Sequence, residues 1–566
     1  MTKKGIPIGF DDFQDVRKGN YYFVDKSLFI KNILHAGQVV LCTRPRRFGK
    51  TLNLSMLAYF FDITQDNRQL FDGLKISQEP EFEEHLNKYP VITFSFKGIK
   101  KPNWTECYAQ IVSNFKGLYE QYRYLLDSPQ ISAERKKTIQ AILAGKATQI
   151  EIEQGLFFLS ELLYHHHNQK VVILIDEYDS PIYVAYEQGY YGQLMDFMRP
   201  VFEFSLKNNK YLARAVVTGI LRIVKESLFS GVNNLAVSSI LEHDTLADKF
   251  GFTESEVKEM LNYYELSEHF EAVKNWYDGY IFGENMIFNT WSVLNYVHRP
   301  QNGLIPYWVN TSGNTLLKQL MLSGVHNIKE KIEPLLNGKE VETTIPGELI
   351  FSDLEVRDDA IFTLLVSSGY LQAMRLPKEP SEIRYKYLLK IPNIELKYVY
   401  QTTIEVWLNV DMKLLNAKFD EMLLALTRGN KEPFEHYFEK FMLSTVSAHD
   451  TKTPDTENFY HALVLGMLSK LEAEYILKSN HEAGYGRYDI CLIPKFPFPR
   501  RYYGQKGIII ELKLANRKTS LSAALKAVQL QIQENRYEAE LKQHGITDVF
   551  RICIAVKGKK FEMTEG

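Results

Sequence analysis

Three consecutive residues, Gly49, Lys50 and Thr51, have the types and the order that a phosphate-binding loop needs. In the pattern G-x-x-x-x-G-K-[ST], the last glycine lets the backbone approach a phosphate, the lysine reaches the outer phosphates, and the hydroxyl binds Mg²⁺. Arg44 stands where the first glycine belongs, which costs the tight turn some freedom but leaves the approach at Gly49 intact. The alternative is a basic turn that opens a buried helix. We expect a phosphate-binding loop, with added positive charge from Arg44, Arg46 and Arg47.

Two acidic residues, Asp176 and Glu177, follow the apolar run 171–175 in "KVVILIDEYDSP". This run is typical of a buried parallel strand, and α/β folds bind ligands at the carboxyl ends of such strands. Asp176 is expected to hold Mg²⁺, directly or through water, and Glu177 to orient or activate the attacking water. Two acids after a strand can also be an unrelated helix cap, but the Gly-Lys-Thr sequence upstream favours the site.

A third apolar run, 215–217, ends at Thr218 and is followed by Arg222 about one helical turn later. A polar residue at this position can sense a γ-phosphate, and an arginine can stabilise the charge that develops during phosphoryl transfer. Arg222 can equally well pair with an acidic residue, so both interpretations stay open.

A second group of candidate residues, Asp489, Glu511 and Lys513, lies near the C-terminus in "GRYDICLIP" and "GIIIELKLA". Both segments are expected to be strands, and Lys513 shares a face with Glu511 because it comes two residues later. The two carboxylates and the carbonyl of Leu512 can hold Mg²⁺, while Lys513 positions or polarises a water that attacks a phosphodiester. The alternative is that Asp489 merely ends a strand and that Glu511 and Lys513 form an exposed pair.

Alternating strands and helices must position these residues. The run "GQVVLCT" before the loop predicts a strand, the segment 51–62 after it has apolar residues at helical spacing, and "YPVITFSFKG" adds another strand. This alternation indicates an α/β core. Residues 240–440 are expected to form helices with short strands, and Thr253 and Glu256 have the spacing of a capping box at one helix start.

The length and composition place the chain among multidomain globular proteins. It has 566 residues, of which 45% are hydrophobic and 24% charged. No apolar stretch of transmembrane length and no signal-peptide-like start occurs, so we expect a cytoplasmic protein without membrane contact. The four cysteines form no C-x-x-C pair, which fits a reducing compartment and indicates that any metal is bound by oxygen ligands.

The C-terminal end of the chain is its basic end. Residues 481–566 contain 15 Lys and Arg against 9 Asp and Glu. Between the two candidate strands lies the loop 495–506, whose basic and aromatic residues we expect to hold nucleic acid near the metal. The sequence supports equally well the alternative that this is a solvent-exposed loop on a solvated face, without a role in binding. The residues concerned are Arg500, Arg501, Tyr502 and Tyr503.

The N-terminal motifs together resemble a known family. "GNYYFVDKSLFIKNIL", "TRPRRFGKTLNLSML", "VVILIDEYDSPI", "TGILRI" and "FSGVNNL" are similar to the AAA-ATPase-like domain of prokaryotic proteins that carry a PD-(D/E)xK nuclease at the other end. The resemblance covers about residues 6–235 and implies a P-loop NTPase fold that uses ATP and Mg²⁺. In this family "RPRRFGK" is the usual form of the loop, so Phe48 belongs to the binding loop as well. The segments after it imply a small helical or winged-helix lid.

The C-terminal segments resemble the PD-(D/E)xK nuclease domain of the same family. "SNHEAGYGRYDICLIP" and "GIIIELKLA" place Asp489, Glu511 and Lys513 on the motif positions, with Glu457 as an additional acid, although Tyr488 replaces the proline. Many of these nucleases carry a Q-x-x-x-Y helix. Gln533 has that spacing to Tyr537, whereas Gln531 matches the usual "QI" of the family, and the sequence does not decide between them.

We therefore expect an AAA-ATPase-like P-loop domain in residues 1–235, a helical or winged-helix lid and linker in 236–440, and a nuclease-like domain in 441–566. The expected function is an ATPase coupled to a Mg²⁺-dependent nuclease that acts on nucleic acid, with DNA favoured. The alternative is a nucleotide-dependent regulatory or signalling switch whose nuclease-like domain is only a binding surface. The sequence leaves the oligomeric state open.

Overall fold

The computed structural model divides into two compact units, which we describe separately. The N-terminal unit contains Met1–Ser312 and Glu340–Lys397, and the C-terminal unit contains Gly313–Lys339 and Tyr398–Gly566. The expected domain boundaries after residues 235 and 440 stay predictions. The structure describes residues 3–207, 209–223, 228, 235–308, 334–335, 338–346, 358–378, 384–400, 416–445, 464–465, 467–468, 471, 474–483, 486–495, 506–515, 519–535, 538–557 and 560–566.

A five-stranded parallel sheet forms the core of the N-terminal unit, in the order β2-β3-β4-β1-β5. β1 and β3 are buried along their whole length, which explains their almost continuous apolar sequences. Because the strands are parallel, their carboxyl ends meet at one edge, where β1 ends at Thr43, β3 at Asp176 and β4 at Gly219. The strands are β1 (Val39–Thr43), β2 (Val91–Ser95), β3 (Val171–Asp176), β4 (Leu212–Gly219) and β5 (Leu235–Ser238).

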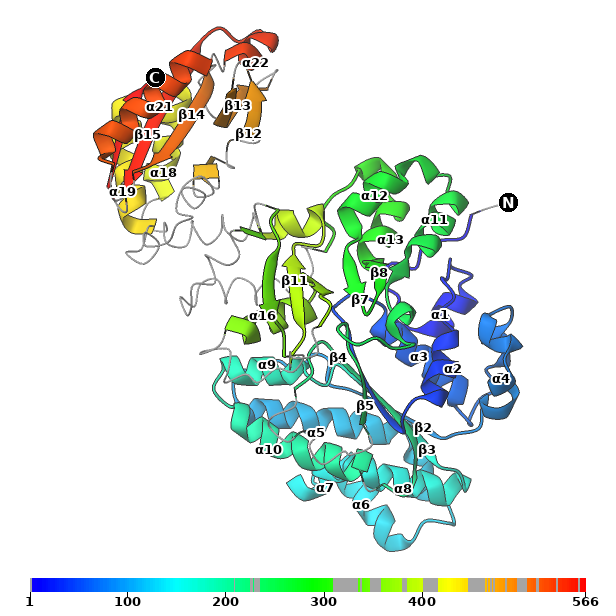
Figure 1. Cartoon of the computed structure of the whole chain (residues 1–566). Coiled ribbons are helices and arrows are strands. Elements are labelled where there is room, and N and C mark those ends of the chain that lie inside the picture. Colours follow the sequence, from blue (N-terminus) through cyan, green and yellow to red (C-terminus); the bar gives the residue numbers. More distant parts are fainter. Residues whose placement is uncertain are drawn as a thin grey trace. The chain divides into compact units, whose positions relative to one another are not determined.

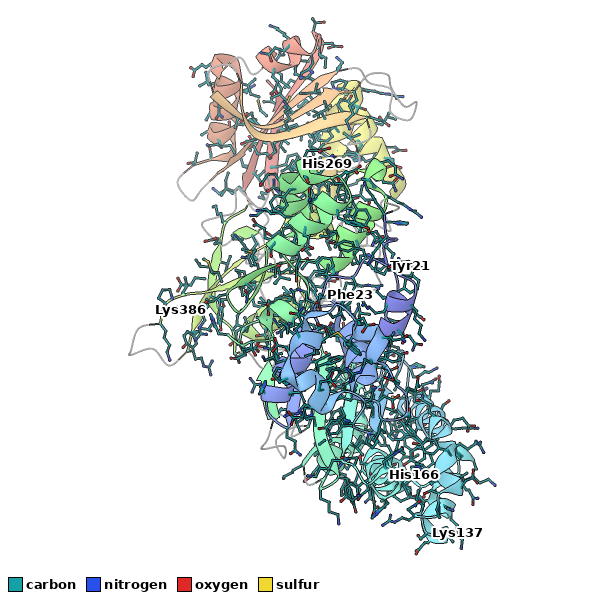
Figure 2. All side chains as sticks on the ribbon, turned by 90° about the vertical axis from the view of Figure 1, so that its right-hand side faces the viewer. Tyr21, Phe23, Lys137, His166, His269 and Lys386 are labelled. Atoms are coloured by element: carbon teal, nitrogen blue, oxygen red, sulfur yellow. The ribbon has the colours of Figure 1, made fainter. Side chains whose placement is uncertain are left out.

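Helices cover both faces of this sheet. Figure 1 shows α1, α2 and α3 on one side and α5 to α8 with α10 on the other. In Figure 2, Lys137 of α6 and His166 of α8 lie at the same end of the unit. The helices are α1 (Phe13–Lys18), α2 (Leu28–His35), α3 (Lys50–Phe61), α4 (Pro80–His85), α5 (Trp104–Gln121), α6 (Ala133–Leu143), α7 (Gln149–Glu153), α8 (Gly155–His167), α9 (Ser180–Glu187) and α10 (Tyr191–Phe202).

Two small antiparallel sheets complete the N-terminal unit, in the orders β6-β8-β7 and β10-β11-β9. Thr253 caps α11 in a capping box with Glu256, as its spacing predicts. The description of this region as a winged-helix lid stays a prediction. Its elements are β6 (Phe252–Thr253), α11 (Glu254–Tyr263), α12 (Phe270–Tyr277), β7 (Tyr280–Phe282), β8 (Asn285–Phe288), α13 (Thr290–His298), β9 (Val341–Thr344), α16 (Asp358–Ser367), β10 (Gln372–Arg375) and β11 (Lys386–Lys390).

A second five-stranded sheet, in the order β12-β13-β14-β15-β16, forms the core of the C-terminal unit. Only the pair β14 and β15 is parallel, and the other neighbours are antiparallel. The elements of this unit are α18 (Asn416–Arg428), α19 (Lys431–Thr445), β12 (Tyr475–Ala483), β13 (Gly486–Pro494), β14 (Gly507–Leu514), α21 (Leu521–Asn535), α22 (Glu538–Gln543), β15 (Val549–Lys557) and β16 (Lys560–Glu565).

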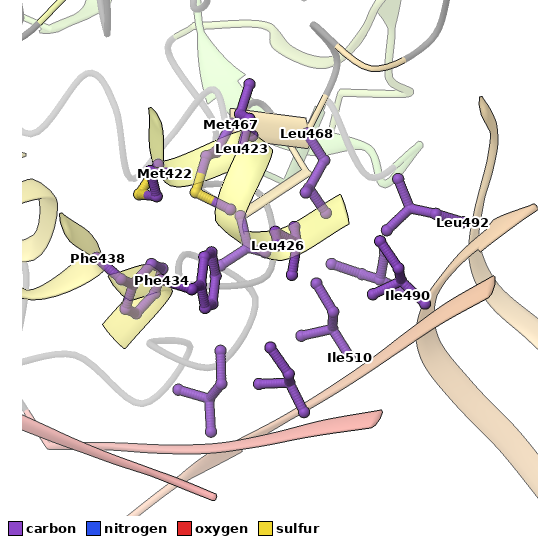
Figure 3. Packing of buried hydrophobic residues seen from close by; sticks show 14 of the residues in the cluster. Met422, Leu423, Leu426, Phe434, Phe438, Met467, Leu468, Ile490, Leu492 and Ile510 are labelled. Atoms are coloured by element: carbon purple, nitrogen blue, oxygen red, sulfur yellow. The ribbon is translucent and has the colours of Figure 1, made fainter. Parts of the chain in front are cut away.

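The two faces of this second sheet pack against different helices. Ile490 and Ile510 pack with Leu426 and Phe434 of α18 and α19 on one face (Figure 3). Their neighbours Cys491 and Ile509 pack with Val528 and Ile532 of α21 on the other face. Because successive side chains alternate between faces, the odd-numbered residues of β13 and β14 belong to the α21 side.

The predicted α/β fold class is confirmed by these two sheets. Within the part of the chain that the structure describes, no helix combines the length and the apolar character that a membrane crossing requires.

Candidate functional site

The loop between β1 and α3 ends in a glycine whose backbone conformation costs free energy in most other residues. Gly49 is the N-cap of α3 and has a φ of +84°, in the left-handed region. A Cβ atom built there meets no heavy atom within 4 Å, so the space around this atom is open and it is the backbone angle that favours the glycine. The N-terminus of α3 therefore lies beside open space, which suits the binding of an anion.

Lys50 is buried within this loop. Its Nζ donates hydrogen bonds to the carbonyl oxygens of Arg44 (3.0 Å) and Pro45 (2.8 Å). Burial lowers the pKa of Lys50, while the negative charges of Asp176, Asp179 and Glu177 raise it. A phosphate that binds here would stabilise the charged ammonium group of Lys50, which burial has removed from water.

Asp176 connects the loop helix to the neighbouring strand. Its Oδ2 accepts a hydrogen bond from Thr51 Oγ1 at 2.8 Å, and its Oδ1 accepts one from Thr218 Oγ1 at 2.5 Å. Asp176 and Thr218 are buried on the adjacent strands β3 and β4. The structure thus brings together Lys50, Thr51, Asp176 and Thr218 at the carboxyl edge of the sheet. Their carboxylate and hydroxyl oxygens suit Mg²⁺.

Glu177 follows Asp176 in an unusual backbone conformation. Its φ is +51°, which costs free energy in any residue other than glycine and is found mainly where surrounding structure enforces it. Burial raises the pKa of Glu177, and the charge of Asp176 raises it further. A carboxylate with a raised pKa accepts a proton from water more readily, which suits the predicted role in water activation.

The side chain of Arg44 does not point its charge toward the phosphate site, contrary to what we expected from the sequence. It is completely buried, and its guanidinium nitrogens donate to the oxygens of Thr43, Ser238 and Leu246. Phe48 is buried as well, with its ring 4.9 Å from that of Tyr280. Both side chains pack the loop against the rest of the unit.

Arg46, Arg47 and Arg222 have different surroundings. Arg46 and Arg47 are exposed, and the guanidinium of Arg47 stacks 4.3 Å from the ring centroid of Trp291. Arg222 lies 3.9 Å from the carboxylate of Glu242, which agrees with the alternative that it pairs with an acid. The role of Arg222 in charge stabilisation stays a prediction.

Asp179, which no sequence motif singled out, shapes the segment after β4. Its buried Oδ2 accepts hydrogen bonds from the backbone N–H groups of Ile220 (2.8 Å) and Leu221 (2.9 Å). A Cβ atom at Gly219 would come within 2.8 Å of Asp179 Oδ1 and 2.6 Å of the Tyr178 ring. The third acid of "DEYDSP" and the glycine of "TGILRI" were the available signals.

In the C-terminal unit, Asp489 and Glu511 lie opposite each other on β13 and β14, one position beyond the pair Ile490 and Ile510. The Asp489 N–H donates to Glu511 Oε1 at 3.1 Å, and the Leu512 N–H donates to Asp489 Oδ2 at 2.8 Å. Each carboxylate is thus held by the backbone of the opposite strand. The two carboxyl groups therefore converge on the α21 face.

Gln531 of α21 completes this group, because its Nε2 donates to Glu511 Oε2 at 3.2 Å. Gln531 thus reaches the carboxylates. The side chain of Gln533 and the whole of Tyr537 lie outside the described residues, so the choice between the two glutamines for the nuclease motif stays a prediction. Burial raises the pKa of Glu511, the charge of Asp489 raises it further, and the charge of Lys513 opposes this shift. A cation between the carboxylates would relieve the same repulsion.

Lys513 is exposed and, by strand alternation, lies on the same face as Glu511. Glu457 and the loop residues Arg500, Arg501, Tyr502 and Tyr503 lie outside the described residues. Among the residues that are described, no group of three or more His, Cys, Asp or Glu side chains forms a metal cage. The two carboxylates and the Leu512 carbonyl are hard oxygen ligands, and this donor set fits Mg²⁺ with water in its other positions.

Comparisons with known proteins find a family match for each of the two segments that hold these candidate residues. Residues 7–229 match a family described as predicted AAA-ATPase, and residues 455–565 match the PD-(D/E)XK nuclease superfamily. Both resemblances inferred from the sequence are thereby confirmed. A protein of Azotobacter chroococcum mcd 1, described as an uncharacterized protein in the vnfD 5' region, is 27% identical over 403 residues. The alignment covers 70% of this chain and 69% of that protein.

Proposed function

We propose that this chain, which combines an AAA-ATPase-like domain with a PD-(D/E)XK nuclease superfamily domain, binds and hydrolyses ATP to control Mg²⁺-dependent cleavage of nucleic acid. The arrangement of Asp489, Glu511 and Gln531 carries this proposal. Glu511 is buried beside the partly buried Asp489. Two carboxylates placed so close have a high electrostatic cost, and a domain that served only as a binding surface would gain nothing from it.

In the nucleotide site, Lys50 and the N-terminus of α3 would bind the phosphates. Thr51 and Asp176 would hold Mg²⁺. The hydrogen bonds that Asp176 accepts from the hydroxyl groups of Thr51 and Thr218 preorganise its carboxylate for this role. Glu177 would take the proton of the attacking water. Thr218 would respond to the γ-phosphate, because its hydrogen bond to Asp176 holds its hydroxyl group beside the residues that would bind Mg²⁺.

In the nuclease site, Asp489, Glu511 and the Leu512 carbonyl would hold Mg²⁺. When bound, the ion supplies a Lewis acid for the phosphodiester and lowers the pKa of a water. Lys513 would position the attacking water and stabilise charge on the phosphate. Gln531 would keep Glu511 oriented toward Asp489 through its hydrogen bond.

The nucleic-acid partner, with DNA favoured over RNA, would be held by the basic loop 495–506. A cytoplasmic location belongs to the same proposal, and the four cysteines, all free thiols, support it.

The test is a cleavage assay on plasmid, linear and single-stranded DNA and on RNA, with and without Mg²⁺ and ATP. Glu511→Gln and Asp489→Asn, which preserve shape and remove one charge, should each slow cleavage about 100-fold or more. Glu562→Gln is the matched control, because Glu562 is an exposed carboxylate of the same domain on β16. It should cleave like the parent protein.

Equal cleavage by parent and Glu511→Gln would refute the nuclease assignment. Mg²⁺-independent binding of nucleic acid without any cleavage would instead favour the regulatory alternative, in which the domain is a binding surface.

A further inference from the structure

The residue that replaces the first glycine of the phosphate-binding pattern is the most enclosed charged side chain of the nucleotide loop. Arg44 has a relative exposure of 0%. Its Nη1 donates to the carbonyl oxygens of Thr43 (2.8 Å) and Ser238 (2.9 Å). Its Nη2 donates to Ser238 Oγ (2.8 Å) and to the Leu246 carbonyl oxygen (3.3 Å).

The surroundings of Arg44 compensate only in part for burying a cation, because its Nε has no hydrogen-bond partner within the described part of the chain. The guanidinium carbon lies 5.0 Å from the Phe250 ring centroid and 5.4 Å from that of Phe282. The nearest oxygen of Asp244 is 4.0 Å away. Burial still lowers the pKa of Arg44. Because a buried ion gives little net stability, the fold alone does not explain an arginine here.

The backbone of Arg44 connects this anchored side chain to the nucleotide site. Its N–H donates to the Gly219 carbonyl oxygen at 3.0 Å, directly after Thr218 on β4. Its own carbonyl oxygen accepts the hydrogen bond from Lys50 Nζ at 3.0 Å. Ser238, which holds the guanidinium, ends β5 beside Cys42 of β1. One residue thus joins the ends of β4 and β5 to Lys50.

We propose that Arg44 is a positioning residue of the nucleotide loop, which acts through its anchor on Ser238 and Leu246 instead of through charge toward the phosphates. The anchor fixes the Arg44 carbonyl and with it the place of the Lys50 ammonium. This inference rests on the proposed binding of ATP by the same loop. It also explains how the loop keeps its shape without the first glycine.

The decisive variant is Arg44→Lys, because it keeps the charge and loses the two-pronged geometry of the guanidinium. If Arg44 acted through its positive charge on the phosphates, Arg44→Lys would bind ATP as tightly as the parent protein. If the role is anchoring, we expect its affinity for Mg²⁺-ATP to fall on the order of tenfold or more in calorimetry. Thermal unfolding, measured in parallel, establishes that the variant is folded.

Ser238→Ala removes one anchoring hydroxyl without touching the loop, and it decides the question should Arg44→Lys fail to fold. We expect its KM for ATP to rise several-fold, on the order of the loss of one hydrogen bond to a charged group, with kcat near the parent value. Ser160→Ala is the matched control. Ser160 is equally buried, and its hydroxyl donates to the Leu156 carbonyl oxygen at 2.8 Å within α8.

The outcomes separate this inference from the function on which it rests. A parent protein that binds no ATP would overturn both. A parent that binds ATP, together with parent-like affinity in Arg44→Lys and Ser238→Ala, would overturn only the positioning role. An equal loss of ATP affinity in Ser160→Ala and Ser238→Ala would also overturn it, since general destabilisation would then be the cause.

Discussion

At the scale of single residues, Lys50 and Glu177 should contribute to different steps of one reaction. Lys50 is a buried cation whose described hydrogen bonds all go to backbone carbonyl oxygens. Glu177, in contrast, is a carboxylate with a raised pKa. We expect Lys50→Ala to weaken ATP binding about tenfold or more, because the cation facing the phosphates is lost. Glu177→Gln should bind ATP but hydrolyse it about 100-fold more slowly.

Calorimetry and a phosphate-release assay measure the two effects. Lys137→Ala is the control for removal of a lysine, because Lys137 is exposed on α6 at a distant end of the unit (Figure 2). Tight ATP binding by Lys50→Ala would refute the assignment of the loop.

The protonation of the buried carboxyl group of Glu395 should affect the stability of the fold. Glu395 is fully buried, accepts hydrogen bonds from Ser292 Oγ to both carboxylate oxygens (3.0 and 2.9 Å), and accepts one from the Trp308 N–H at 2.7 Å. Burial raises the pKa of Glu395 to about 7. The folded protein therefore binds a proton that the unfolded chain releases near pH 4.5.

The free energy of unfolding should consequently fall as the pH rises from about 4.5 to about 7, by up to about 3 kcal/mol from this group. Glu395→Gln should lose this part of the pH dependence. Chemical denaturation of both proteins between pH 5.5 and 8 measures the difference, and parallel curves would contradict the prediction.

At the scale of elements, the sequence predicted local structure well. The apolar run 171–175 folds as β3, the helix after Gly49 runs from Lys50 to Phe61, and Thr253 with Glu256 forms the capping box. These features depend on neighbours within a few residues. The surroundings of Arg44 depend instead on Ser238, which is 194 positions away, so no local pattern could reveal them.

Helix phase explains why the sequence could not choose between Gln531 and Gln533. Both flank Ile532, which packs on the sheet with Val528. Either neighbour of a buried helical residue can lie at the edge of the buried face. The position of α21 over β14 decides that Gln531 contacts Glu511.

The contact between the loop and α13 gives an element-scale prediction. Arg47 has a φ of +68°, its carbonyl oxygen accepts a hydrogen bond from Thr290 Oγ1 at 2.6 Å, and its guanidinium stacks on Trp291. ATP binding should shift this loop and change the tryptophan fluorescence. Trp291→Phe should remove most of that change while ATP still binds.

Trp104→Phe is the matched control, because Trp104 packs with Tyr108 and Phe197 on α5 and α10. It should leave the fluorescence change nearly intact. A full change in Trp291→Phe would mean that α13 does not respond to the nucleotide.

At the scale of the whole molecule, the two candidate sites belong to separate compact units. Changes in one unit should therefore leave the intrinsic chemistry of the other intact. We expect Lys513→Ala to slow cleavage about 100-fold, because it removes charge near the phosphate, while Mg²⁺ binding and ATP hydrolysis stay near the parent values. Simultaneous loss of ATP hydrolysis in this variant would contradict that separation.

The sequence could predict that two α/β units exist, since each has its own alternation of strands and helices. The sequence could not predict how nucleotide state would reach the nuclease site in the coupling that we propose, because local patterns reveal only neighbours within a few residues.

The most direct test is the rate of Mg²⁺-dependent DNA cleavage with and without ATP, in the parent and in Lys50→Ala, with Mg²⁺ kept in excess so that ATP does not remove the metal. We predict that ATP changes the cleavage rate of the parent and leaves that of Lys50→Ala unchanged, while Glu511→Gln cleaves in neither condition. Cleavage by the parent that is the same with and without ATP, or undiminished cleavage by Glu511→Gln, would contradict the account.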